Sequence, residues 1–278
     1  MNKLFILALD AGHYLATPGK RCLKSLDPGE TREWILNNTV TQFQEERARQ
    51  YEGLITVRVD DPTGRTETTL AERVALANSI NADFYLSNHH NAGINGKRGG
   101  GCVAYCSKGS TKSPAWRDAL YDAVIDAGGI KGDRTNPKTV ADWYVCRHTN
   151  MPAVLMEYGF MDSPEDVPVI LTEDHAKLCG YATIDAIAKK AGLALKETIA
   201  EGPVEEPTSA DVRYKGIEDA PEYTRHTIAE LMSCGALNGT GSDKGIDLGL
   251  DALRLLTITT RYIKHVHGLA PDQAEIIE

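Results

Sequence analysis

The chain has 278 residues, a net charge of -9 and 42% hydrophobic residues, which is typical of a globular protein with one large core and room for a second, smaller domain. The acidic balance argues against nucleic acid or an anionic membrane as a partner, because both need a positive protein surface. The 6 cysteines include no C-x-x-C pair and no dense spacing, which favours reduced thiols over a disulfide framework.

The first apolar run, "LFILALD" at residues 4–10, resembles the start of a signal peptide only superficially. It is too short for the apolar core of such a peptide, and no small-residue cleavage site follows it. No stretch of the sequence approaches the ~20 apolar residues that a membrane helix needs. We therefore expect a protein that is made in the cytoplasm without a signal peptide or membrane span. If it works outside the cell, it must be released by some other means.

Three apolar runs, at residues 4–10, 82–88 and 153–159, are predicted to be strands buried on both faces. Helical patterns alternate with them, at residues 28–48, 69–81, 114–127 and 173–190, and the last ends before Gly192. This alternation predicts an α/β domain over residues 1–193, with a mostly parallel, twisted sheet flanked by helices.

The remainder of the chain has a different character. Residues 194–211 are acidic, contain two prolines and lack apolar periodicity, which indicates a linker. Residues 212–278 carry two helical patterns, one ending near Gly235 and one at 251–266, and predict a small, mainly helical C-terminal domain. Its core is thin, so contact with a surface or a partner chain would help to stabilise it.

Polar residues gather where the predicted strands end. His13 follows the first strand, His89 and His90 end the second, and Glu157 ends the third. In open α/β sheets such groups meet beyond the carboxyl ends of the strands. Two histidines with carboxylates fit a catalytic zinc site, which needs three protein ligands, an open position for water and a nearby base.

The carboxylates differ in how well a structural role explains them. Glu30 and Glu33, in the helix expected from residue 28, are both available as the third ligand. Glu30 also fits a capping box in "DPGE", with Asp27 as the cap and Pro28 in the first turn. Glu157 lies inside "VLMEYGF", where a buried carboxylate is costly unless it is paired, protonated or close to a metal. Glu157 is therefore the strongest indication of a functional site.

Five ordered motifs carry a family resemblance: "LDAGH" (9–13), "EWILN" (33–37), "LAERVALAN" (70–78), "ADFYLSNHHNA" (82–92) and "MPAVLMEYGFMDSPED" (151–166). With them, residues 4 to about 190 resemble the zinc-dependent N-acetylmuramoyl-L-alanine amidases of phage endolysins and bacterial autolysins. The resemblance implies one Zn²⁺ per catalytic domain, bound by His13, Glu33 and His89, with Glu157 as the catalytic acid and base.

The histidine motif departs from the family pattern in two places. Asn88 stands where the family usually has an apolar residue, and His90 stands where a small residue is common. With His89 as the ligand, strand alternation turns His90 to the other face, where a polar or core-edge role is expected. Asn91 is expected to orient a ligand by a hydrogen bond.

The resemblance also implies a substrate and a place of action. The bond cut would be the amide between N-acetylmuramic acid and the L-alanine of the stem peptide in bacterial peptidoglycan, reached after phage lysis or non-classical export. The segment "IEDAPEYTRHTIAELMSCGALNGTG" at 217–241 weakly resembles an S-layer-homology-like module, which implies binding of a wall polymer or self-association.

Two other functions compete with this hypothesis. One is a non-catalytic wall-binding protein on a degenerate amidase fold. The presence of all three expected zinc ligands and of Glu157 argues against it. The other is a nucleotide-binding protein, but no G-x-G-x-x-G or Walker sequence follows the first strand.

Overall fold

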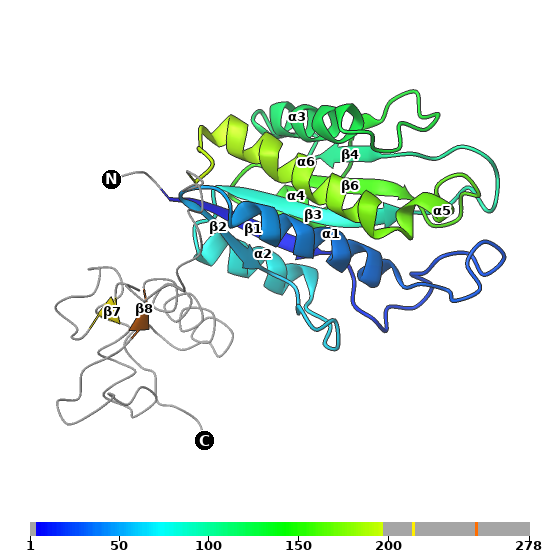
Figure 1. The fold of residues 1–278 in the computed structure, drawn as a ribbon, viewed down its shortest axis with the longest axis horizontal. Helices are drawn as coiled ribbons and strands as arrows, with labels where there is room; N and C mark the ends of the chain where they lie inside the picture. The colour runs from blue at the N-terminus through cyan, green and yellow to red at the C-terminus, as the bar shows by residue number, and fades with distance from the viewer. Residues whose placement is uncertain (1–3, 197–212, 215–247, 250–278) are drawn as a thin grey trace, which may run out of the picture. The chain divides into compact units, whose positions relative to one another are not determined.

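The computed structural model describes residues 4–196, 213–214 and 248–249 (Figure 1). The chain divides into two units, Met1–Glu197 and Thr198–Glu278. In the second unit, the described residues form an antiparallel pair of short strands, β7 (Arg213–Tyr214) and β8 (Leu248–Gly249). The helices predicted there lie outside the described residues, so the linker at 194–211 and the mainly helical domain at 212–278 remain predictions.

The first unit is built on a six-stranded sheet with the order β2-β1-β3-β6-β4-β5. The neighbours from β2 to β6 pair in parallel, β4 pairs antiparallel to β6, and β5 pairs in parallel with β4. The strands are β1 (Phe5–Ala11), β2 (Leu54–Arg58), β3 (Phe84–Asn91), β4 (Val103–Cys106), β5 (Lys138–Val140) and β6 (Ala153–Phe160). The prediction of an α/β fold with a mostly parallel sheet is confirmed.

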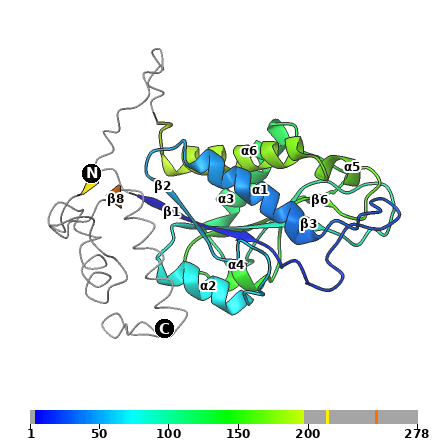
Figure 2. The same ribbon diagram turned by 60° about the horizontal axis from the view of Figure 1, so that its bottom comes forward.

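Helices cover both faces of the sheet (Figure 2). One face carries α1 (Glu33–Ala48), α3 (Ser113–Asp126) and α6 (Glu173–Ala191), with α6 packed against both of the others. The other face carries α2 (Leu70–Ser79) and the short α4 (Tyr144–His148), which contact each other. A further short helix, α5 (Val167–Ile170), lies between β6 and α6 in the chain.

The central strands are apolar on both sides because each side faces a helix layer. Successive residues of a strand point to opposite faces. Leu7, Phe84 and Val154 accordingly pack on the side of α1, α3 and α6, while Ala8, Tyr85 and Leu155 pack on the side of α2 and α4. Burial of each large apolar side chain stabilises the fold by about 1.5–3 kcal/mol. The carboxyl ends of β1, β3 and β6 are thereby held firmly at one edge.

The start of the first helix differs from the prediction. Helix α1 begins at Glu33, with Arg32 as its N-cap, and the predicted capping box at 27–30 is wrong. The Asp27 carboxylate instead accepts the amide hydrogens of Gly29 and Thr31, at 3.0 and 2.6 Å, and so closes a turn. Glu30 has a φ of 49°, a left-handed conformation that cannot continue into a helix. The predicted stop at Gly192 is confirmed, with a φ of 72°.

The cysteines of the described residues are all buried and free, as expected: Cys22, Cys102, Cys106, Cys146 and Cys179. Cys102 and Cys106 are fully buried beside and within β4, where they serve as small apolar side chains. Within the same part of the chain, no helix combines the length and the apolar character needed to cross a membrane.

Candidate metal and catalytic site

Three of the predicted site residues meet at the carboxyl edge of the sheet. His13 follows β1, Glu33 is the first residue of α1, and His89 lies near the end of β3. The Glu33 carboxylate reaches both histidines, with Oε1 3.0 Å from His89 Nδ1 and Oε2 3.4 Å from His13 Nε2. One potential ligand atom from each residue lies within 4.8 Å of the others. The geometry is that of a small N,N,O cluster around a shared centre.

The turn that carries His13 depends on a close approach of backbone to ring. A Cβ atom on Gly12 would lie 2.1 Å from Cε1 of His89, so a larger residue there would collide with that imidazole. His13 itself has a φ of 68°, which is uncommon for a residue other than glycine, although histidine adopts it more readily than most. The Gly-His pair thus allows the two imidazole rings to stand 5.0 Å apart between centroids.

The charges of the cluster are strongly coupled. Burial alone would raise the pKa of Glu33, but its contacts with His13 and His89 hold that pKa well below its usual range. Burial lowers the pKa of His13, whereas the Glu33 carboxylate outweighs burial at His89 and raises its pKa. The cluster therefore favours an anionic Glu33 beside histidine nitrogens.

Two atoms of the cluster retain bonding capacity that a cation would use. His13 Nε2 and Glu33 Oε2 are buried and make no hydrogen bond within the described chain, because their 3.4 Å approach lacks hydrogen-bond geometry. Two imidazole nitrogens and one carboxylate oxygen are a ligand set that suits zinc, with a fourth position open. The residues present therefore fit the predicted metal.

The alternative ligand Glu30 is not part of this cluster. Its carboxylate pairs with Arg21 at 3.3 Å and with Lys24 at 3.8 Å, and the group that could hold a metal ion contains Glu33 instead. The structure thus brings Glu33, and not Glu30, to the two histidines.

Glu157 lies beside the cluster on β6, paired in register with His89 on β3. It is 8% exposed, and its Oε2 makes no hydrogen bond within the described residues. Burial, reinforced by Glu33 and opposed by His89, raises the pKa of Glu157 to about 8. A carboxyl group with a pKa near neutrality can both accept and donate a proton.

These side chains open onto a pocket of about 350 Å³. His13, His89 and Glu157 line it together with Lys20, whose Nζ lies 3.4 Å from Glu33 Oε2. Two exposed apolar side chains, Leu70 and Trp143, line the same pocket. The pocket thus presents a buried carboxyl group, two histidines of the possible metal site and apolar surface to one bound molecule, a combination suited to hydrolysis of a polar substrate.

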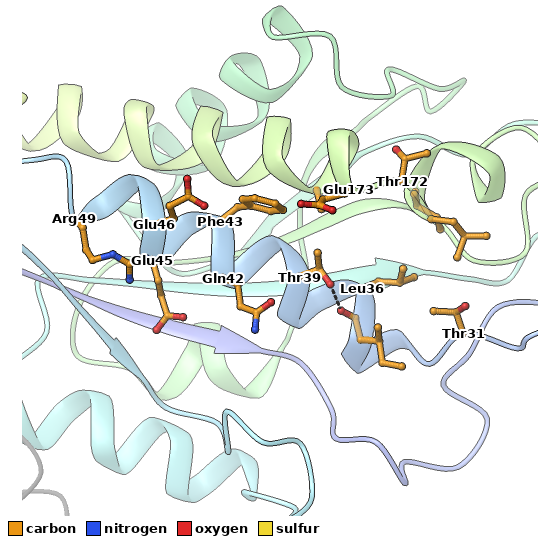
Figure 3. Close-up of a pocket in the computed structure, with 14 residues that line it drawn as sticks. Thr31, Leu36, Thr39, Gln42, Phe43, Glu45, Glu46, Arg49, Thr172 and Glu173 are labelled. Carbon is orange, nitrogen blue, oxygen red and sulfur yellow. Dashed lines mark hydrogen bonds between the residues drawn. The ribbon is translucent and has the colours of Figure 1, made fainter.

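A larger cavity, of about 700 Å³, lies elsewhere, between α1 and the segment 170–176 (Figure 3). Its charged lining consists of Glu45, Glu46 and Glu173 with Arg49, and it contains no histidine or cysteine. None of its residues belongs to the group that could hold a metal ion in the described chain. We therefore place the candidate site in the smaller pocket.

Asp10 and Arg73, to which the sequence analysis gave no role, line the same pocket. Arg73 of α2 forms a buried ion pair with Asp10 of β1 and donates to the backbone oxygens of Ala11 and His13, at 2.9 and 2.8 Å. Its position in the sequence carried a signal, because Arg73 lies three residues before buried Leu76 and four before buried Ala77, on the core face of the helix.

The neighbours of His89 divide as strand alternation predicts. His90 turns toward α1, where its Nδ1 lies 2.8 Å from Oδ1 of Asn37. Asn91 was expected to orient a ligand, but its Oδ1 accepts the amide hydrogen of Ala92 at 2.8 Å. No hydrogen bond from Asn91 to the three clustered residues occurs in the described chain. Asn37, through its contact with His90, is therefore a better candidate than Asn91 for orienting a ligand.

Comparisons with known proteins place most of the first unit in a family. The family model described as N-acetylmuramoyl-L-alanine amidase matches residues 7–189. The N-acetylmuramoyl-L-alanine amidase CwlM of Bacillus licheniformis is 33% identical over 128 residues, which are 46% of this chain and 45% of that protein. The endolysin of Bacillus phage SPP1 is 28% identical over 162 residues, which are 55% of this chain and 57% of that protein. The chain thus spans about half the length of the curated relatives it matches.

Solved structures share the fold. The catalytic domain of CwlV, an N-acetylmuramoyl-L-alanine amidase from Bacillus (Paenibacillus) polymyxa var. colistinus, superposes with a TM-score of 0.59 at 21% identity, covering 69% of this chain and 100% of that domain. An N-acetylmuramoyl-L-alanine amidase from Clostridium difficile 630 gives a TM-score of 0.60 at 21% identity, covering 68% of this chain and 98% of that one.

Proposed function

The chain belongs to the N-acetylmuramoyl-L-alanine amidase family, and we propose that it hydrolyses the amide bond between N-acetylmuramic acid and L-alanine in bacterial peptidoglycan. One observation carries this proposal: His13, Glu33 and His89 lie close enough together to hold a metal ion, and Glu157 lines the same pocket as the two histidines. A metal-ligand set beside a carboxyl group of raised pKa is the equipment of a hydrolase that activates water. The alternative of a wall-binding protein without activity is not favoured, because none of the four residues is missing.

We propose that His13, Glu33 and His89 hold one zinc ion. When bound, the ion supplies a Lewis acid that makes the scissile carbonyl and a water molecule more reactive. Glu157 accepts a proton from the water as its oxygen attacks the carbonyl carbon. The same carboxyl group then donates that proton to the departing nitrogen as the C–N bond breaks. The products are a lactyl carboxylate on the sugar and a free amino group on L-alanine.

The first experiment compares the wild type with Glu157→Gln on purified Gram-positive peptidoglycan. Zinc content and newly released L-alanine amino termini are measured for both. We expect about one zinc in each protein and a rate that falls about 10²–10⁴-fold in the variant, as for loss of a general acid and base. Chelation of the metal should abolish activity, and added zinc should restore it.

A matched control is Glu67→Gln, since Glu67 lines the same pocket but is exposed. It should leave zinc content unchanged and alter the rate by much less. Equal activity of Glu157→Gln and wild type would disprove the role of Glu157. A wild type that binds no zinc would disprove the metal site, and one that binds zinc but frees no amino termini would disprove the proposed bond.

We further propose an endolysin-like role, supported by the 28% identity to the endolysin of Bacillus phage SPP1. A protein of this kind lyses cells whose wall it can reach. Purified protein added to Gram-positive cells should reduce their turbidity, and Glu157→Gln should not. A wild type that cuts isolated peptidoglycan but never lyses cells would favour a wall-remodelling role.

The proposed C-terminal domain, residues 212–278 after a linker at 194–211, is assigned to binding a wall polymer or to self-association. Glu157→Gln in the full chain allows wall binding to be measured without digestion. Its affinity for wall fragments and its mass in solution should both be compared with those of a form that ends at Glu197. A truncated form equal to the full chain in both measurements would refute this assignment.

A further inference from the structure

We infer that Asn37 is a positioning residue whose carboxamide holds the two histidine-bearing segments, Gly12–His13 and His89–His90, in place around Glu33. The inference rests on the proposed function, because it assumes that His13, Glu33 and His89 bind the metal. Asn37 itself is not a ligand and is not expected to touch the substrate. It acts through the backbone and the side chain of its neighbours.

The position of Asn37 in the helix accounts for its reach. It lies four residues after Glu33 on α1, so the two side chains share one face of the helix. Asn37 is fully buried, and its Nδ2 donates to the carbonyl oxygen of Gly12 at 3.0 Å. Its Oδ1 lies 2.8 Å from Nδ1 of His90. One carboxamide therefore joins the residue before one histidine to the residue after the other.

The hydrogen-bonding capacities fix the direction of both contacts. The Gly12 carbonyl can only accept, so the amide nitrogen of Asn37 must face it. The amide oxygen then faces His90, and Nδ1 of that imidazole must carry the hydrogen. The backbone amide of His90 donates to Glu33 Oε1 at 3.3 Å. Glu33 and Asn37, one helical turn apart, thus both contact β3 at His90, Glu33 through the backbone and Asn37 through the side chain.

The turn at His13 needs such support because its backbone is in the left-handed region. Three successive carbonyl oxygens in this turn are held by side chains. Arg73 holds those of Ala11 and His13, and Asn37 holds that of Gly12 between them. Of these two side chains, only Asn37 stands on the helix that also carries Glu33. It therefore couples the position of His13 to that of the carboxylate.

The test measures metal binding and not catalysis. The dissociation constant for zinc is determined by competition with a chelator for wild type, Asn37→Ala and Asn37→Asp, and the visible absorption of the cobalt-substituted proteins reports ligand geometry. Asn37→Ala should weaken zinc binding about 10–100-fold, as loss of a group that orients ligands does, and should change the cobalt spectrum. Asn37→Asp keeps an acceptor for His90 but loses the donor to Gly12, so it should weaken binding as well.

The matched control is Asn38→Ala, at the next position of the same helix. Asn38 is also buried, but its Oδ1 accepts a hydrogen bond from Arg58 at 2.9 Å, and its side chain makes no hydrogen bond to the histidine segments in the described chain. This variant should bind zinc within about threefold of wild type and keep the cobalt spectrum. The control separates a general loss of buried polar contacts from a specific loss of ligand position.

The outcomes distinguish the inference from the function on which it rests. If wild type binds no zinc, the proposed function fails first. If wild type binds zinc but both Asn37 variants match Asn38→Ala in affinity and spectrum, the inference is overturned. If Asn37→Asp alone retains wild-type binding, the contact with Gly12 has no part in positioning and the inference is also overturned. Should Asn37→Ala not fold, the nearly isosteric Asn37→Asp decides the question against the same control.

Discussion

Replacement of Arg73 by methionine tests how far the site depends on the buried ion pair that Arg73 forms with Asp10. Arg73 is 3% exposed and Asp10 is 1% exposed, so neither charge is compensated by water. The arginine holds the pKa of Asp10 below its ordinary value, against the effect of burial, which would raise it. Methionine fills a similar volume but, among the described residues, leaves the Asp10 carboxylate with the hydroxyl groups of Tyr85 and Ser87 as its side-chain hydrogen-bond donors.

The expected cost follows from this burial. Removal of one partner from a buried ion pair leaves an uncompensated charge and costs about 3–5 kcal/mol. The carboxylate keeps two hydroxyl donors, at 3.0 and 2.6 Å, which places the expected loss toward the lower end of that range, at about 3 kcal/mol. The loss of contacts at Ala11 and His13 should also weaken zinc binding. Because the unpaired Asp10 would be protonated more easily in the folded variant, the penalty should shrink as the pH falls.

The assay is urea unfolding of the metal-free protein near neutral pH, for the single variant Arg73→Met and the double variant Arg73→Met/Asp10→Asn. The double variant removes the orphaned charge, so it should regain part of the lost stability despite carrying one more substitution. A loss below about 1 kcal/mol in the single variant would show that the pair contributes no more than a surface contact. A double variant that is less stable than the single one would show that the cost does not come from the charge of Asp10.

Three further predictions concern single side chains. Gly12→Ala should weaken zinc binding at least about 10-fold and destabilise the fold by about 1–3 kcal/mol, because its Cβ would stand 2.1 Å from the His89 ring; zinc competition and urea unfolding measure both. Lys20→Met should tighten zinc binding about 1.5–5-fold in the same competition assay, because the ammonium group near Glu33 is 44% exposed and a pair of this kind contributes ~0.2–1 kcal/mol. Burial lowers the pKa of His175 in the folded state below 6.5, so the free energy of unfolding should fall as the pH drops below that value. His175→Gln keeps a donor for the Tyr158 carbonyl but cannot titrate. The decrease in the free energy of unfolding between about pH 7 and 5, measured by urea unfolding, should therefore be smaller in this variant by up to ~1.4 kcal/mol per pH unit. The same pH dependence in variant and wild type would disprove this.

The edge of the sheet was predictable from the sequence because parallel strands carry their carboxyl ends to one side. That rule brings His13, His89 and Glu157 together without any knowledge of loops. The third member of the cluster was not decided by local pattern. Glu30 and Glu33 both suited a helix beginning at residue 28, and only the turn closed by the Asp27 side chain moves the helix start to Glu33.

Features that depend on pairing between distant segments were beyond the sequence analysis. Strand β4 is short and follows a run of glycines, and nothing local indicates that it pairs antiparallel to β6. Asp10 and Arg73 are 63 positions apart, so the charge that neutralises each of them could not be read from neighbouring residues. Arg73 was not singled out in the predicted helix at 69–81, although its spacing from Leu76 placed it on the buried face.

This chain departs from its family pattern at Asn88 and His90, and both side chains have hydrogen-bonding partners on α1. Asn88 is fully buried and exchanges two hydrogen bonds with Gln44, at 2.8 and 3.0 Å, where an apolar side chain would need neither. His90 lies two residues further along the same strand, and its Nδ1 contacts Oδ1 of Asn37. A slip of β3 by one residue would break both sets of contacts and turn His89 away from Glu33. Since a buried polar pair adds little net stability, we expect its main effect to be on the register of β3, and through it on the position of His89 in the proposed metal site.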